Sequence, residues 1–123
     1  AFTISPKIDT IVTNKFAIET ILSNLLSNAL HYSPANSPVT ILVTPDTNTT
    51  RVKFSISNTS IYQYTATELG KFFEPLWQKD QSRTSSQRYG LGLAIVKSYC
   101  DNINAEISIA LAPNNQISFT VIV

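Results

Sequence analysis

The chain has 123 residues, of which 43% are hydrophobic and 14% are charged, and its formal net charge is +1. This length fits one domain, and the composition excludes a disordered chain because it supplies enough apolar residues for a core. The scattered charges argue against nucleic acid or an anionic membrane surface as a partner. The single cysteine excludes an internal disulfide. With only one cysteine and one histidine in the chain, a structural zinc site is not expected.

The first residues predict a domain taken from a longer protein, because the chain begins at Ala1 rather than Met and opens on a strand-like stretch. No apolar run reaches the length of a membrane span, and no signal peptide is evident. Residues 2–5 are expected to form a short strand, which Pro6 ends.

A long amphipathic helix is expected over residues 15–31, with Asn14 as its N-cap. Its apolar residues recur at intervals of three and four, which makes a broad stripe. The stripe consists of Ile18, Ile21, Leu22, Leu25, Leu26, Ala29 and Leu30. Two prolines and an asparagine in "SPANSP", residues 33–38, end the helix.

Two alternating segments follow, residues 39–44 and 51–57, each with its apolar side chains on one face. The turn-forming sequence "PDTNTT" between them predicts a hairpin. Residues 58–67 are polar and irregular, and residues 68–73 are expected to form a short helix.

The stretch "WQKDQSRTSSQR", residues 77–88, is almost free of apolar residues and predicts a long loop. A second strong helix is expected over residues 90–102, and a closing hairpin over residues 105–112 and 116–123 around "PNN". This order predicts one α/β (α+β) domain over residues 1–123. Its architecture would be a two-layer α/β sandwich, with a mixed, about five-stranded sheet covered on one face by helices.

Polar side chains line the rim of the first helix. Asn24 and Asn28 are four residues apart and therefore stack on one face, with His31 close to them. Asparagine is a poor helix former, so two of them call for a reason. They form either a solvated face or a polar row that faces a cleft, where carboxamide oxygens suit Mg²⁺ together with phosphate and water.

Two further features each allow a structural or a functional interpretation. Asn58 ends a predicted strand, where its side chain is either part of a turn or holds the edge of a base in a crevice. Gly90 and Gly92 precede the second helix and either give flexibility to the junction or let phosphate approach the free N–H groups of the helix start. The pattern is neither a dinucleotide fingerprint nor a P-loop.

Taken in order, three motifs resemble the ATP-binding domain of sensor histidine kinases, which shares the Bergerat-type ATP-binding fold with gyrase, heat-shock chaperones and mismatch-repair ATPases. "NLLSNALHYSP" resembles the N box of that family, "FFEPLW" resembles the F box, and "YGLGLAIVK" is similar to the second glycine box. The resemblance covers essentially the whole chain, with a polar lid at about residues 77–89.

The resemblance implies a role for each matching residue. Asn28 would coordinate Mg²⁺, Asn24 would lie near the phosphates or their water, and Tyr32 would line the base and sugar. The implied catalytic residues are Asn24 and Asn28, and the implied metal ligand is Asn28. The implied cofactor-binding residues are Asn28, His31, Tyr32, Asn58, Arg83, Arg88, Gly90, Leu91, Gly92 and Leu93.

The lid is expected to be anchored by packing of its aromatic and apolar neighbours, which are Phe72, Phe73, Leu76 and Trp77. Arg83 keeps a basic residue in the lid. His31 stands where the family usually has lysine, and it is partly charged at neutral pH. It is not the phosphoacceptor, because that histidine belongs to a separate helical dimerisation domain in the family.

The first glycine box of the family, D-x-G-x-G, is replaced by "NTSIY". Asn58 takes the place of the aspartate that receives the adenine amino group, and Ser60 and Tyr62 replace both glycines. A neutral hydrogen bond contributes about 0.5–1.5 kcal/mol against about 1.5–3 for a charged one, so this change is expected to cost about tenfold in affinity. Arg88 replaces the first glycine of the second box.

Two functions follow from the resemblance. The first is a histidine kinase catalytic domain that binds Mg-ATP weakly and donates the γ-phosphate to its own dimerisation domain. The alternative is a degenerate, pseudokinase-like docking module. The implied setting is cytoplasmic, the resemblance also allows a membrane-anchored parent protein, and a response regulator is implied as an indirect partner. The isolated domain is expected to be monomeric, without nucleic-acid or direct membrane contact.

Overall fold

The computed structural model describes residues 2–4, 13–46, 51–74 and 92–123. The elements in these ranges are β1 (Phe2–Ile4), α1 (Lys15–Tyr32), β2 (Val39–Pro45), β3 (Val52–Thr59), α2 (Ala66–Leu69), α3 (Gly92–Asn102), β4 (Glu106–Ala112) and β5 (Gln116–Ile122).

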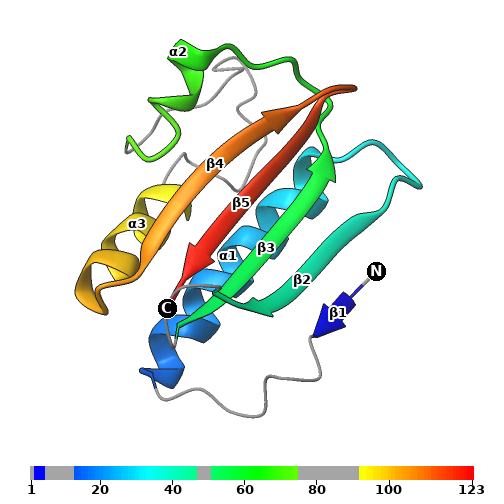
Figure 1. Ribbon diagram of the computed structural model, residues 1–123. Coiled ribbons are helices and arrows are strands. Elements are labelled where there is room, and N and C mark those ends of the chain that lie inside the picture. Colours follow the sequence, from blue (N-terminus) through cyan, green and yellow to red (C-terminus); the bar gives the residue numbers. More distant parts are fainter. Residues whose placement is uncertain (1, 5–12, 47–50, 75–91) are drawn as a thin grey trace.

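One five-stranded sheet organises the domain, with the strand order β1-β2-β3-β5-β4. In this order, β2, β3, β5 and β4 pair antiparallel with their neighbours. The three-residue β1 pairs parallel with β2. Helices α1 and α3 pack against each other on one face of this sheet (Figure 1). The predicted two-layer α/β sandwich with a mixed sheet is therefore confirmed.

The predicted start and end of α1 also hold. The side-chain oxygen of Asn14 accepts a hydrogen bond from the N–H of Ala17 at 3.0 Å, which satisfies one of the free donors of the first turn. The helix ends at Tyr32, and Ser33 adopts extended backbone before Pro34. This conformation is the one that a following proline favours.

The core lies between the helices and the sheet. It combines the buried face of α1 with that of α3 and with the inward side chains of β3 and β5, and its members include Ile21, Leu25, Ala29, Val96, Cys100, Ile56, Ile117, Phe119 and Val121. The other face of the sheet carries hydroxyl pairs across its central strands, Ser57 with Ser118 at 2.8 Å and Ser55 with Thr120 at 3.4 Å. The strand period thus separates an apolar face from a polar one.

Two boundaries differ from the prediction. Strand β3 continues two residues further, because Asn58 pairs with Val39 and Ile117, and Thr59 pairs with Gln116. Helix α2 begins earlier and is shorter than expected, because Thr65 and Glu68 form a capping box that fixes its start. Asn58, which was expected at the end of the strand, therefore lies within it, one residue before its last residue Thr59.

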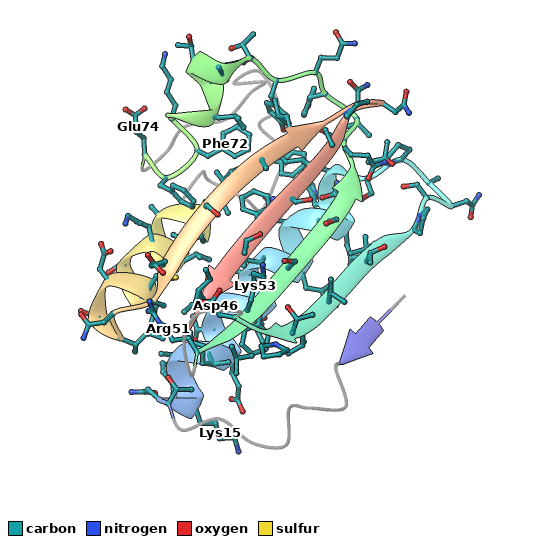
Figure 2. The ribbon with its side chains drawn as sticks, in the orientation of Figure 1. Lys15, Asp46, Arg51, Lys53, Phe72 and Glu74 are labelled. Atoms are coloured by element: carbon teal, nitrogen blue, oxygen red, sulfur yellow. The ribbon has the colours of Figure 1, made fainter. Side chains whose placement is uncertain are left out.

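Arg51 fastens the end of the sheet that lies away from α2 (Figure 2). Its guanidinium donates to Glu106 Oε2 at 2.9 Å, to the carbonyl of Asn104 at 2.6 Å and to that of Ile122 at 3.3 Å. The hairpin β2–β3 is thereby joined to the turn between α3 and β4.

Among the described residues, no helix has the length and apolar character needed to cross a membrane.

Candidate nucleotide site

The polar row of α1 lies at the edge of the buried stripe, as predicted. Asn24 and Asn28 are both half-buried, whereas His31 is exposed. The amide nitrogen of Asn24 donates to the carbonyl of Thr20 at 2.7 Å, which fixes the direction of its side-chain oxygen. Within the described residues no hydrogen bond engages the carboxamide of Asn28, so both of its polar atoms are available to a ligand.

The row meets the start of α3. The side-chain oxygen of Asn24 lies 3.5 Å from the point where a Cβ on Gly92 would stand. The phosphate-binding helix start that the glycines predict is therefore next to the carboxamide row of α1, although the two are far apart in the sequence. A Cβ at Gly92 would meet only ordinary van der Waals contact, so the fold itself does not require this glycine.

Asn58 faces the helices from the end of β3. It is 2% exposed, and its amide nitrogen donates to the carbonyl of Thr59 at 2.9 Å. Its side-chain oxygen accepts no hydrogen bond within the described part of the chain, yet no fully buried side-chain polar atom there lacks a partner. This oxygen is consequently an acceptor that remains open to solvent or to a ligand.

The segment after β3 joins the C-terminal end of α1. The N–H of Ile61 donates to the carbonyl of Tyr32 at 2.8 Å, and the rings of Tyr32 and Tyr62 are 6.0 Å apart. His31 contacts Tyr32 edge-on, with ring centroids 4.6 Å apart. Tyr32, Asn58 and Tyr62 thus gather at the end of the molecule where α1 and β3 finish, one helical turn or more beyond Asn28.

A model of the family described as "Histidine kinase-, DNA gyrase B-, and HSP90-like ATPase" matches residues 13–123. The chain belongs to this family. The resemblance seen in its N box and second glycine box is therefore confirmed.

Relatives within this family are sensor histidine kinases. The sensor histidine kinase YcbM of Bacillus subtilis (strain 168) is 29% identical over 109 residues, which cover 88% of this chain and 34% of YcbM. The sensor histidine kinase HprS of Escherichia coli (strain K12) is 35% identical over 92 residues, which cover 74% of this chain and 19% of HprS. The chain thus spans about a third or less of the length of these relatives.

Solved structures show the same fold. The mycobacterial sensor histidine kinase MprB superposes with a TM-score of 0.81 over 99% of this chain and 78% of the MprB chain, at 17% sequence identity. The predicted Bergerat-type arrangement of sheet and helices is accordingly the fold of histidine kinase catalytic domains.

Several residues assigned to this histidine kinase-like site fall outside the described ranges. They are Leu76, Trp77, Arg83, Arg88, Gly90 and Leu91, together with the rest of the lid at about residues 77–89. Leu93 is described and packs against the core, so a ligand contact from it would come from its backbone. Phe72 is buried and its ring contacts those of Tyr64 and Phe119. Its predicted role as an anchor of the lid stays a prediction, because the lid lies outside the described residues.

The donor set suits a metal ion that arrives with a nucleotide. Among the described residues, no cluster of three or more His, Cys, Asp or Glu side chains is placed to hold a metal by itself. Mg²⁺ commonly takes few protein ligands and completes its shell with phosphate oxygens and water. Asn28, which is half-buried and lies one helical turn beyond the Asn24 that adjoins Gly92, fits that pattern.

Sequence reasoning missed the part played by the residues between β3 and α2. Ser60 is 4% exposed, and its hydroxyl accepts from the N–H of Tyr62 at 3.0 Å and bonds with the hydroxyl of Tyr64. The residues that replace the family's glycines therefore form a closed turn of their own. In the sequence, the two tyrosines at alternate positions in "IYQY" were the signal that could have indicated this turn.

Proposed function

We propose that this domain binds Mg-ATP and donates the γ-phosphate to a histidine on a separate dimerisation domain of the parent protein. The single observation that carries the proposal is the meeting of Asn24 with Gly92, because it joins the polar row of α1 to the start of α3. Backbone N–H groups and the helix dipole at such a start attract phosphate. Membership of the family supports the same ligand.

Asn28 is the proposed ligand of Mg²⁺, through its side-chain oxygen. When bound, the ion neutralises charge on the phosphates and fixes their orientation. Asn24 holds its oxygen toward the α3 start, because its nitrogen is tied to Thr20. Positioning and charge stabilisation dominate phosphoryl transfer, so rigidly placed polar groups of this kind suit the reaction.

Asn58 is the proposed acceptor for the adenine amino group. Its nitrogen is occupied by Thr59, so the open atom of the side chain is the oxygen. Tyr32 lines the same end from α1. Since Asn24, Asn28 and Tyr32 follow one another at intervals of four residues, they advance along the helix by about 6 Å per step. The row runs from the phosphate end of the site toward its base end.

The alternative of a pseudokinase-like docking module is not favoured, because the relatives are named as sensor histidine kinases. Those relatives are about three to five times longer than the matched region, which supports a partner domain with the phosphoacceptor histidine in the parent protein. A response regulator would then receive the phosphate from that histidine. His31, which is exposed in the last turn of α1, is proposed to approach the nucleotide from there.

Calorimetric titration of Mg-ADP tests the proposal. The wild-type chain is expected to bind with a Kd below about 1 mM. Asn28→Ala should weaken binding by about tenfold or more, the equivalent of one charge-assisted contact. Asn102→Ala, an exposed asparagine at the end of α3, is the matched control and should leave the Kd unchanged.

Absence of both heat and a thermal shift with wild type at ligand concentrations above about 1 mM would contradict the proposal. Transfer is measured separately, by autophosphorylation of the parent protein with labelled ATP. The Asn28→Ala parent should lose the label, and the Asn102→Ala parent should keep it.

A further inference from the structure

A continuous row of aromatic side chains runs from the exposed end of α1 into the core. Neighbouring rings in this row have centroids between 4.6 and 6.2 Å apart. In order, the row consists of His31, Tyr32, Tyr62, Tyr64, Phe72 and Phe119. It links α1, the segment between β3 and α2, the turn after α2, and β5.

Tyr62 is held firmly in this row. Its N–H is bonded to the buried hydroxyl of Ser60, whose own N–H donates to the carbonyl of Asn115 at 2.8 Å. The next residue toward β3, Ile61, is bonded to the carbonyl of Tyr32. The backbone around Tyr62 is therefore fastened to α1 and to the turn between β4 and β5, so its ring has a defined place.

Tyr62 is half-buried, although the rings of Tyr32 and Tyr64 contact it. Its centroid lies 6.0 Å from that of Tyr32 and 6.0 Å from that of Tyr64, which is the range of direct aromatic contact. No third ring fits between rings at this separation. A planar ligand can consequently use only the exposed part of the Tyr62 ring, not a slot between tyrosines.

A hydrogen-bond acceptor for a ligand lies at the start of the same segment. The open oxygen of Asn58 belongs to a side chain that is almost wholly buried, four residues before Tyr62. Tyr62 adjoins the C-terminal end of α1 through Tyr32, and the N–H of Ile61, three residues after Asn58, bonds to the carbonyl of Tyr32. An aromatic face and a directed acceptor are the two groups that a nucleobase needs.

We propose that Tyr62 is a base-stacking residue, whose exposed ring packs against the purine of the bound nucleotide. The inference rests on the proposed function and names a contact that a glycine at this position does not make. Stacking on an aromatic side chain tolerates any base, whereas the Asn58 oxygen selects a base with an amino group. The change from glycine to tyrosine thereby offsets the weaker hydrogen bond that comes with asparagine at position 58.

Calorimetric titration of Mg-ADP into Tyr62 variants tests the stacking contact. Tyr62→Ala is expected to weaken binding by roughly 5- to 100-fold, the usual effect of removing one stacking ring. Tyr62→Phe keeps the aromatic face and should bind within about twofold of wild type. Tyr62→Leu keeps apolar bulk but has no aromatic face, so it should bind like Tyr62→Ala while preserving the fold.

Tyr99→Ala is the matched control, because Tyr99 is half-buried on α3 and contacts Phe16, away from the proposed base end. It should not change the Kd for Mg-ADP. In nuclear magnetic resonance spectra of the wild type, Mg-ADP should shift the ring protons of Tyr62, which a purely structural role would leave in place.

The outcomes separate this inference from the proposed function. If wild type binds Mg-ADP and both Tyr62→Ala and Tyr62→Leu bind as tightly or more tightly, the stacking role is wrong and the proposed function stands. If wild type itself does not bind Mg-ADP, the proposed function and the stacking role are both wrong.

Discussion

Asn58 is buried, and its side-chain oxygen is an open hydrogen-bond acceptor. Replacing it with the aspartate that the family has at this position should therefore lower the stability of the free protein. The side chain donates to the carbonyl of Thr59, a bond that an ionised carboxylate cannot make. In the free protein a carboxylate there would be buried and would face a carbonyl oxygen. The substitution that favours the nucleotide should therefore weaken the empty fold.

Asn58→Asp is predicted to have opposite effects on stability and on binding. The free energy of unfolding of the free protein should fall by about 1–3 kcal/mol, because a polar contact is lost and a charge is buried. Mg-ADP should bind about tenfold more tightly, because a charged acceptor replaces a neutral one. Urea unfolding and calorimetry measure the two quantities. The control is Asn14→Asp, at an exposed N-cap where aspartate and asparagine cap a helix equally well. Unchanged stability of Asn58→Asp would contradict the buried-acceptor argument.

Tyr64 gives the base end a measurable pH dependence. Burial raises the pKa of Tyr64 to about 12, and the hydrogen bond from Ser60 lowers it in part. Because the folded pKa exceeds the ordinary value of 10.0, the folded state holds the proton more tightly, and its stability is fully present below pH 10 and is lost as the pH rises toward 12.

We predict that Ser60→Ala raises the pKa of Tyr64 further, since the bond that favours the ionised form is removed. Ultraviolet absorbance of tyrosinate measures this, as the difference between a protein with Tyr64 and its Tyr64→Phe counterpart. A Tyr64 that titrates at its ordinary value in the folded protein would refute the burial argument, and a lowered pKa in Ser60→Ala would refute the role of the hydroxyl.

At the ends of helices and strands, asparagine occupies the backbone positions of positive φ where most proteins have glycine. Among the described residues, the non-glycine positions with positive φ are all asparagines, namely Asn36, Asn104, Asn114 and Asn115, with φ from 57° to 65°. Asparagine enters the left-handed region at lower cost than other side chains. A chain with three glycines can therefore still close a helix and a tight hairpin.

The end of α3 offers a clean test of this substitution. Asn104 has φ 57°, and after it the N–H of Ala105 bonds to the carbonyl of Cys100 at 2.8 Å, the six-to-one bond of a helix C-terminus. Asn104→Ala is expected to lower the free energy of unfolding by about 1 kcal/mol, whereas Asn104→Gly should equal or exceed wild type. Denaturant unfolding measures both, and equal stability of the two variants would rule out the conformational explanation.

Most elements could be predicted from the sequence, because hydrophobic period and turn residues are local signals. The start of α1 at Lys15, its Asn14 cap and the "PNN" turn are examples. The end of β3 could not, because Asn58 and Thr59 are held in the strand by partners on β2 and β5 that lie far away in the sequence. The start of α2 depends on the Thr65–Glu68 capping box, a local signal that the prediction did not use.

The site divides in the same way at the scale of the whole molecule. The residues of the proposed phosphate end, Asn24, Asn28 and Gly92, stand in motifs that the sequence shows, and the fold brings Asn24 and Gly92 together. The base end of the site was not predictable, because motif comparison registers Ser60 and Tyr62 as lost glycines. Only the fold shows that they build a fastened turn and part of an aromatic row through the domain.

Cys100 makes the stability of the whole domain accessible to a chemical measurement. It is fully buried between the helices and the sheet, and burial raises its pKa to about 11. Since the thiolate is the reactive form, the folded protein should not react with a thiol reagent near neutral pH, and labelling should require opening of the core.

Nucleotide binding to the folded state should therefore slow the labelling of Cys100. At a Mg-ADP concentration of about 100 times Kd, the rate is expected to fall about 100-fold, which corresponds to about 2.7 kcal/mol, provided that opening and closing are fast relative to labelling. A second thiol introduced by Ser98→Cys, at an exposed position of α3, is the control and should react at once with or without nucleotide. If labelling is slow but saturating Mg-ADP does not change its rate, the reagent reaches Cys100 through a local opening of α3 that the nucleotide does not restrain. That result would contradict the view that the sheet, the helices and the site open as one cooperative unit.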